Sequence, residues 1–279
     1  MNTLKTGILL AAIGGLAVAI GGYFFGQNGA VIALVLALAF QALSLFQGHK
    51  MAIAFARAQE LPQGTIPWLE QATDELSRRA GIPSPKLYLS PDPQPNAFAA
   101  GWKPDVAVVC FNQGLLDSMS RREVTAVLAH ELAHIRNRDT LTMTVAAAAA
   151  SMISFVAQIG WFIPRGDDSD RNPIVDLLMF LVAPIAAMLI QMAVSRTREY
   201  AADQTAAELM GDARPMMEAL QTLGMATSRI PSRTAQPATA HMYISQPLHG
   251  GLMSLFSTHP PLESRIQRLA SLTPSLAAA

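Results

Sequence analysis

Charged residues are scarce in this sequence, at 14% of its 279 residues, whereas an average soluble domain carries about 25%. Lys, Arg, Asp and Glu are absent from residues 6–49, 140–164 and 177–195. A membrane-spanning helix needs about 20 predominantly apolar residues. The first stretch therefore has room for two spans and each of the others for one, so we expect four transmembrane helices.

The uncharged N-terminal stretch has a second interpretation as a cleaved signal peptide, because Lys5 precedes an apolar run. A further apolar run of spanning length follows directly, which favours two retained spans joined by a turn at residues 27–29. No Lys or Arg lies between these spans, whereas Lys50 and Arg57 follow the second one. The positive-inside rule then places both termini in the cytoplasm.

These stretches divide the chain into membrane and cytoplasmic parts. We expect two N-terminal transmembrane helices in 1–49 and a first cytoplasmic part in 50–139. The third and fourth transmembrane helices, joined by a short outer loop, are expected in 140–195, followed by a second cytoplasmic part in 196–279. The expected fold class is a mainly α membrane protein with α+β character, in which the cytoplasmic domain carries a small β-sheet.

Two further absences exclude other classes of protein. The formal net charge is zero, and no basic patch interleaved with aromatic residues is present, so nucleic-acid binding has no support. Cys110 is the only cysteine, which excludes an internal disulfide. It lies in the apolar run VAVVCF, where a buried strand residue is expected.

The cytoplasmic parts show clear local patterns. Residues 66–80 predict a helix stopped by Gly81, and strands are expected near 86, 97 and 106. Ser120 followed by Glu123 forms a capping-box pattern, so the next helix should begin near Arg121. Further helices are expected to about Met210, over 215–227 and after the prolines at 260–261, with a long irregular loop over 228–258.

The helix from Arg121 carries the pattern HELAH. Residues four apart lie on one helix face, so His130 and His134 can present ring nitrogens to one zinc ion. Glu131 lies beside them, where a carboxylate can take a proton from an attacking water during peptide hydrolysis. A capped helix is the context that such ligands require.

A catalytic zinc usually has three protein ligands, and Glu199 is the candidate for the third. It follows the fourth expected span, while His134 precedes the third, so an even number of spans returns both to the same membrane face. Asp203 lies one turn further on and could accept the free N–H of a ligating imidazole. Alternatively, Glu199 and Asp203 only pair with Arg196 and Arg198 on a solvated helix.

Four motifs together resemble the HtpX heat-shock membrane metalloproteases, which are relatives of the CAAX prenyl protease: PNAFAAG, HELAHIRNRD, SRTREYAAD and STHPPLESRI. The resemblance covers nearly the whole chain. It implies a gluzincin-type protease that binds one zinc ion per chain through His130, His134 and Glu199, with Glu131 as the catalytic base. It also implies cleavage of misfolded or damaged membrane proteins and unfolded polypeptides at the bacterial inner membrane, with the active site in the cytoplasm.

The resemblance gives a meaning to other residues. The edge strand expected at Asn96, Ala97, Phe98 and Ala99 would pair with an extended substrate backbone. His259 is a candidate donor to the oxyanion or a contact of the last helix with the site, and otherwise a surface histidine. Arg265 could pair with Asp203 or face water.

Two alternative functions remain open at this point. One is an intramembrane zinc protease, although Arg121, Arg122 and Arg138 would then be costly at membrane depth. The other is a membrane scaffold with a structural zinc, although such sites usually have four protein ligands, often including Cys. The oligomeric state and the side-chain preference for substrates are not fixed by the sequence.

Overall fold

The computed structural model describes residues 2–142, 197–227, 229–230, 244 and 260–276. The chain forms two compact units. One consists of Met1–Phe46 and Thr142–Val194, and the other of Gln47–Leu141 and Ser195–Ala279. The candidate site lies within the second unit, which is therefore described in more detail.

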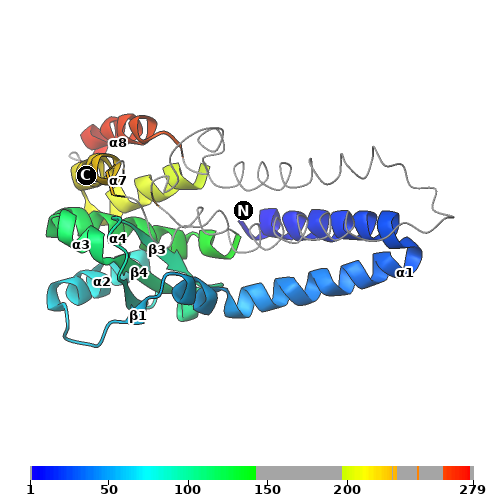
Figure 1. The fold of residues 1–279 in the computed structure, drawn as a ribbon. Coiled ribbons are helices and arrows are strands. Elements are labelled where there is room, and N and C mark those ends of the chain that lie inside the picture. The colour runs from blue at the N-terminus through cyan, green and yellow to red at the C-terminus, as the bar shows by residue number, and fades with distance from the viewer. Residues whose placement is uncertain (1, 143–196, 228, 231–243, 245–259, 277–279) are drawn as a thin grey trace. The chain divides into compact units, whose positions relative to one another are not determined.

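Helix α1 runs from Asn2 to Phe55 and is interrupted at Gly26, where φ is 69° and ψ is −161° (Figure 1). Glycine has no Cβ, so it adopts this positive φ without steric cost. Within the described ranges, no helix combines the length and apolarity needed to cross a membrane. The expected spans at 140–164 and 177–195 lie almost entirely outside those ranges. The structure thus does not confirm the four-span expectation.

The second unit contains a small mixed sheet of four strands in the order β1-β2-β4-β3. The strands are β1 (Gln59–Glu60), β2 (Lys86–Ser90), β3 (Ala97–Ala100) and β4 (Val108–Asn112). β2 and β4 are parallel, whereas β3 is antiparallel to β4 and forms one edge. The three expected strands are confirmed, but the last begins at Val108 because a 3-10 turn occupies Pro104–Val106. β1 was not expected, since two residues carry no periodic signal.

Strand β4 is buried on both faces because helices cover both sides of the sheet. Val109 and Phe111 belong to the main core. The alternate residues, Val108 and Cys110, pack in a second cluster that includes Ala52 of α1. Cys110 has no exposed surface, which confirms it as a buried strand residue. Burial raises the pKa of its thiol to about 12.

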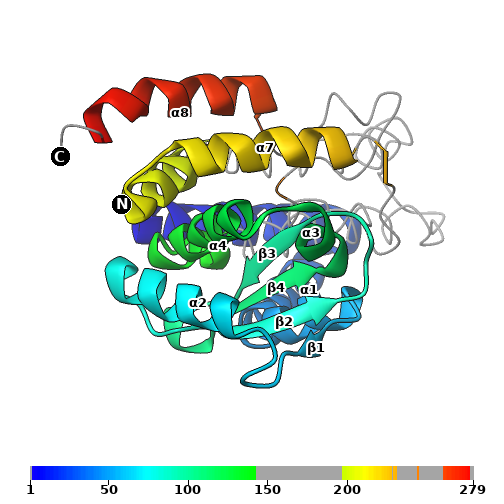
Figure 2. The same cartoon turned by 90° about the vertical axis from the view of Figure 1, so that its left-hand side faces the viewer.

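The main core lies between the sheet and a stack of helices. Helix α4 packs against β3 and α2 on one side and against α7 on the other, and α7 packs against α8 (Figure 2). After α1, the described helices of the unit include α2 (Pro67–Ala80), α3 (Gln113–Ser118), α4 (Arg121–Arg136), residues 197–210, α7 (Arg214–Thr227) and α8 (Leu262–Leu276). Helix α4 is therefore the central element of the unit.

Local signals set the bounds of these helices. Gly81 ends α2 in the left-handed conformation, with φ at 68°, as its sequence predicts. The Ser120 hydroxyl accepts a hydrogen bond from the Glu123 N–H, and the Glu123 carboxylate accepts one from the Ser120 N–H. This reciprocal capping box confirms Arg121 as the first residue of α4. Most of the loop expected at 228–258 lies outside the described residues.

Candidate metal centre

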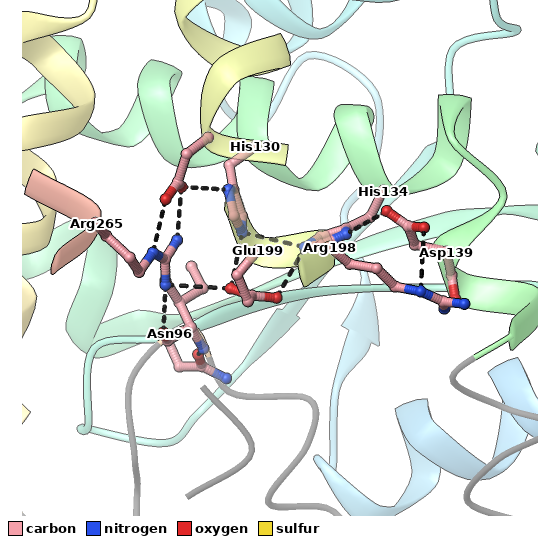
Figure 3. Close-up of polar contacts among 9 residues, drawn as sticks. Asn96, His130, His134, Asp139, Arg198, Glu199 and Arg265 are labelled. Atoms are coloured by element: carbon pink, nitrogen blue, oxygen red, sulfur yellow. Dashed lines mark hydrogen bonds and ion pairs between the residues drawn. The ribbon is translucent and has the colours of Figure 1, made fainter. Parts of the chain in front are cut away.

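His130 and His134 lie one turn apart on the buried face of α4. Their Nε2 atoms approach each other to 3.1 Å, and the rings meet edge to face. Helical periodicity places residues i and i+4 on one face, so the sequence spacing alone brings these nitrogens together. The imidazoles face the carboxylate of Glu199, as Figure 3 shows.

Glu199 reaches the histidines from the helical residues 197–210. Its Oε1 lies 3.4 Å from His134 Nε2 and its Oε2 lies 3.6 Å from His130 Nε2. Ligand atoms of the three side chains lie within 4.8 Å of one another, and all three residues are buried. The chain thus has a buried His-His-Glu group that is able to hold a metal ion.

The outer nitrogen of each imidazole contacts a carboxylate. Asp203 Oδ1 lies 3.0 Å from His130 Nδ1, and Asp139 Oδ2 lies 3.1 Å from His134 Nδ1. An ionised carboxylate can only accept a hydrogen bond, so Nδ1 of His134 is the donor to Asp139, and a proton on Nδ1 of His130 faces Asp203. In neutral imidazoles both Nε2 atoms are then acceptors, and they lie close to each other and to the Glu199 carboxylate. The two imidazole nitrogens and the carboxylate oxygen then repel each other, because no proton lies between them. A cation that binds nitrogen and oxygen ligands, as zinc does, would satisfy all three.

The electrostatics of the pocket also favour a positive charge. Burial works to lower the pKa of His134, but its hydrogen bonds to Asp139 and Glu199 outweigh that effect and raise the pKa well above its usual value. Burial acts on His130 in the same direction, and its hydrogen bonds to Asp203 and Glu199 again leave its pKa raised. Because two protonated rings at 3.1 Å would repel each other, one divalent ion is the better source of the charge.

Arg265 of α8 holds the carboxylates of this site from the other side. Its Nε and Nη2 donate to the two oxygens of Asp203 at 2.8 and 2.7 Å, and its Nη1 lies 3.1 Å from Glu199 Oε2. Burial works to raise the pKa of Asp203, but the charge of Arg265 outweighs it, so the pKa lies below its usual value. Of the two positions expected for Arg265, the structure shows the one paired with Asp203.

The carboxylate of Glu131 is buried beside the histidines, with 3% of the residue exposed. Burial raises its pKa, while the positive charges of His130 and His134 and a backbone hydrogen bond from Ala99 act in the opposite direction. Ala99 belongs to the edge strand β3. Glu131 therefore lies between the His-His-Glu group and that strand, with a proton affinity above that of an exposed Glu.

Asn96 precedes β3 and binds a main chain. Its Oδ1 accepts a hydrogen bond from the N–H of Ile244 at 2.9 Å, and the C=O of Ile244 accepts one from Arg265 Nη1 at 3.0 Å. Ala97 and Phe98 are buried, and Ala99 is partly exposed. His259 lies outside the described residues, so its expected role is not addressed by the structure.

Comparison with known proteins assigns the family. The model of Peptidase family M48 matches residues 64–273, which include every residue of the site. The chain belongs to peptidase family M48. As a member of that family it is a zinc metalloprotease, and its His130, His134 and Glu199 group is able to hold the metal.

Relatives of this M48 peptidase match along its whole length. A "Protease HtpX homolog" of Persephonella marina is 45% identical over 278 residues, covering 96% of both chains. One of Pelotomaculum thermopropionicum is 42% identical over 280 residues, covering 98% of this chain and 99% of its own. The expected resemblance to the HtpX proteases is therefore confirmed.

A solved structure shares the fold of the M48 peptidase. S. mikatae Ste24p superposes with a TM-score of 0.57 at 21% identity. The match covers 96% of this chain but 65% of that chain. At this low identity the likeness concerns the fold alone.

Asp139 and Arg198 belong to the site of this M48 peptidase but were not predicted as such. Arg198 Nη1 donates to the Asp139 C=O at 3.2 Å, and Arg198 Nε lies 3.6 Å from Asp139 Oδ1. In the sequence, Arg198 was a candidate only for a solvated ion pair, and Asp139 had no expected role. An available signal was that Asp139 follows a histidine of the pair just beyond the end of the helix, within reach of its outer nitrogen.

Proposed function

We propose that this M48 peptidase is a membrane-anchored endopeptidase that cleaves misfolded or damaged membrane proteins and unfolded polypeptides at the cytoplasmic face of the membrane. The observation that carries the proposal is the buried His-His-Glu group next to Glu131, a carboxyl of raised pKa. The relatives support this proposal, because proteins named as HtpX protease homologues match the chain over nearly its whole length.

Each residue of the site has a distinct part in the proposed reaction. His130, His134 and Glu199 would hold zinc, which activates the attacking water and polarises the scissile carbonyl when it is bound. Glu131 takes a proton from the attacking water and delivers it to the departing amine nitrogen. Its raised pKa suits both transfers, because a catalytic acid–base group works best when its pKa is near the operating pH.

The substrate would bind at β3 as an added strand. Only one side of β3 pairs with β4, and the Ala99 N–H hydrogen bond to Glu131 places this strand beside the catalytic carboxyl. The main chain of Asn96, Ala97, Phe98 and Ala99 would form hydrogen bonds with the substrate backbone, while the Asn96 side chain binds the N–H of Ile244 at 2.9 Å. Main-chain recognition of this kind selects unfolded chains rather than particular side chains.

Membrane anchoring is supported by the sequence. The uncharged stretches within 1–49 and 140–195 would form four transmembrane helices, and the basic residues after position 49 place the protease part in the cytoplasm. Arg121 and Arg122 are exposed at the start of the histidine helix. Charges at that place favour a metal centre at the membrane surface over an intramembrane one.

Replacement of Glu131 by Gln tests the proposed reaction. Glu131→Gln leaves the three proposed ligands unchanged, so the purified full-length variant should retain its zinc by metal analysis. Its rate of cleavage of an unfolded model protein should fall by about 10²–10⁴-fold, the usual contribution of a general acid–base group.

The matched control for this test is His134→Ala, which should lose both zinc and activity. Full activity of Glu131→Gln would reject the assigned base. A wild-type protein that binds zinc but never cleaves would favour the scaffold alternative.

A further inference from the structure

Asp139 reaches the metal centre through an uncommon backbone conformation. Helix α4 ends at Arg136, Asn137 is its C-cap, and Arg138 follows with φ at 61°. A residue other than Gly is seldom found in this left-handed region. The turn brings the next side chain back along the helix, so that Asp139 Oδ2 lies 3.1 Å from His134 Nδ1. Asp139 is 1% exposed.

Arg198 binds Asp139 from the other ligand-bearing segment. It donates to the Asp139 main-chain oxygen at 3.2 Å, and its Nε lies 3.6 Å from the carboxylate. Arg198 directly precedes Glu199 and is 8% exposed. The Arg198 guanidinium therefore contacts both the main chain and the carboxylate of Asp139, which orients His134. The next residue after Arg198 is Glu199, the third proposed ligand.

The two histidines are held in the same way. His130 contacts Asp203, which pairs with Arg265, and His134 contacts Asp139, which pairs with Arg198. Each of the two histidines thus has its outer nitrogen beside a carboxylate that is itself held by an arginine. A carboxylate behind a ligating imidazole sets its tautomer and orientation.

We infer that Asp139 and Arg198 are positioning residues of the metal centre, which orient His134 and hold the helix of Glu199 beside it. This inference rests on the proposed zinc-binding roles of His130, His134 and Glu199. The two partners are 59 positions apart in the chain, so the ligand geometry depends on contacts such as this one and not on chain connectivity.

Zinc affinity, measured by competition with a chelator on the full-length protein, tests the inference. Asp139→Ala and Arg198→Met should each weaken zinc binding. The loss should be about 10–100-fold for Asp139→Ala, because Asp139 contacts the ligand His134 directly. Asp139→Asn, which keeps an oxygen acceptor without the charge, should be weakened less. The double variant should lose less than the product of the two single effects, because both act on one ligand.

A second Arg–Asp pair provides a matched control. Arg122 Nη2 lies 2.7 Å from Asp212 Oδ2, so this pair joins the start of α4 to the link between the Glu199 helix and α7. Arg122→Met should leave zinc affinity unchanged.

Three outcomes would contradict the inference. Wild-type affinity in Asp139→Ala, or an equal loss in Arg122→Met, would overturn the positioning role alone. A wild-type protein that does not bind zinc would overturn the proposed function, and this inference with it. Circular dichroism of each variant separates a change of affinity from a loss of fold, and the Asn variant keeps the test valid if the Ala variant does not fold.

Discussion

At the scale of single residues, Arg265 is a large cationic side chain that is fully buried. It has no exposed surface, and removing a guanidinium from water is unfavourable unless all its donors find partners. Asp203, Glu199 and the main chain of Ile244 provide them. Burial works to lower the pKa of Arg265, but the adjacent charges of Asp203 and Glu199 outweigh burial and raise the pKa above its usual value. The residue therefore stays charged.

Loss of Arg265 should therefore leave two carboxylates buried without their cation. Arg265→Met is expected to lower the free energy of unfolding by about 3–5 kcal/mol, as for other broken buried ion pairs. Arg265→Lys keeps the charge but cannot bind Asp203 in a bidentate way, so it should retain only part of the stability that Arg265→Met loses.

Thermal or urea unfolding in detergent measures this effect. Arg268→Met on the same helix is the control, because Arg268 is exposed and contacts the ring of Tyr200, and its loss should change stability little. Equal stability of Arg265→Met and wild type would show that the buried ion pairs do not stabilise the fold.

At the scale of elements, helix α4 determines where both histidines point. Its start is fixed by the capping box, and Glu123 also accepts a hydrogen bond from Thr222 of α7 at 2.6 Å. Its apolar face packs into the main core through residues such as Leu128 and Leu132. A shift of one residue would rotate the histidines by about 100°, so the cap and the core together preserve the ligand geometry.

Ser120→Ala removes the capping oxygen of α4. We expect it to lower the free energy of unfolding by about 1 kcal/mol, the typical effect of losing a Ser cap. Thr125→Ala in the same helix is the control, since Thr125 is only partly buried and its hydroxyl bonds within α4 to the Arg121 C=O, and Ala favours helix by a few tenths of a kcal/mol. The prediction is wrong if both variants shift the unfolding midpoint in the same direction and by the same amount.

At the scale of the whole molecule, the site residues all belong to one of the two compact units, although they come from segments on both sides of residues 142–194. The unit thus brings together the three proposed metal ligands of the described residues. This arrangement agrees with a protease domain interrupted by a membrane segment, which is part of the proposed function.

Cysteine labelling can test the proposed topology. Cys110 should not react with the labelling reagent, because it is buried and burial raises the pKa of its thiol to about 12. Arg138 is exposed, so Arg138→Cys should react with a membrane-impermeant reagent in inside-out vesicles and not in intact cells. Ala126→Cys is the control for accessibility, since residue 126 is fully buried and should react only after denaturation.

Each labelling pattern has a distinct meaning. Reaction of Arg138→Cys in intact cells would reverse the topology. Failure to react from either side, with labelling after denaturation, would support the intramembrane alternative.

The sequence by itself determined the features that depend on local geometry. His130, His134 and Glu131 follow from helical periodicity, and the start of α4 follows from Ser120 and Glu123, because these interactions span only a few residues. The strands at 86 and 97 were likewise predictable from short apolar runs bounded by turns. Glu199 required the further argument that two intervening spans return the chain to the same side.

Only the tertiary structure decided which charged residues support the metal centre. Asp139 meets Arg198 across 59 positions, and Asp203 meets Arg265 across 62. The sequence offered Asp203 and Arg265 as candidates beside a solvated alternative, and it gave Asp139 and Arg198 no role at the metal. Packing of α4 against the sheet and α7 removes them from water, and a buried charge is stable only beside its partner. No local sequence pattern encodes this burial. It is therefore the tertiary structure that makes these four charged residues hold the histidines and Glu199 in place.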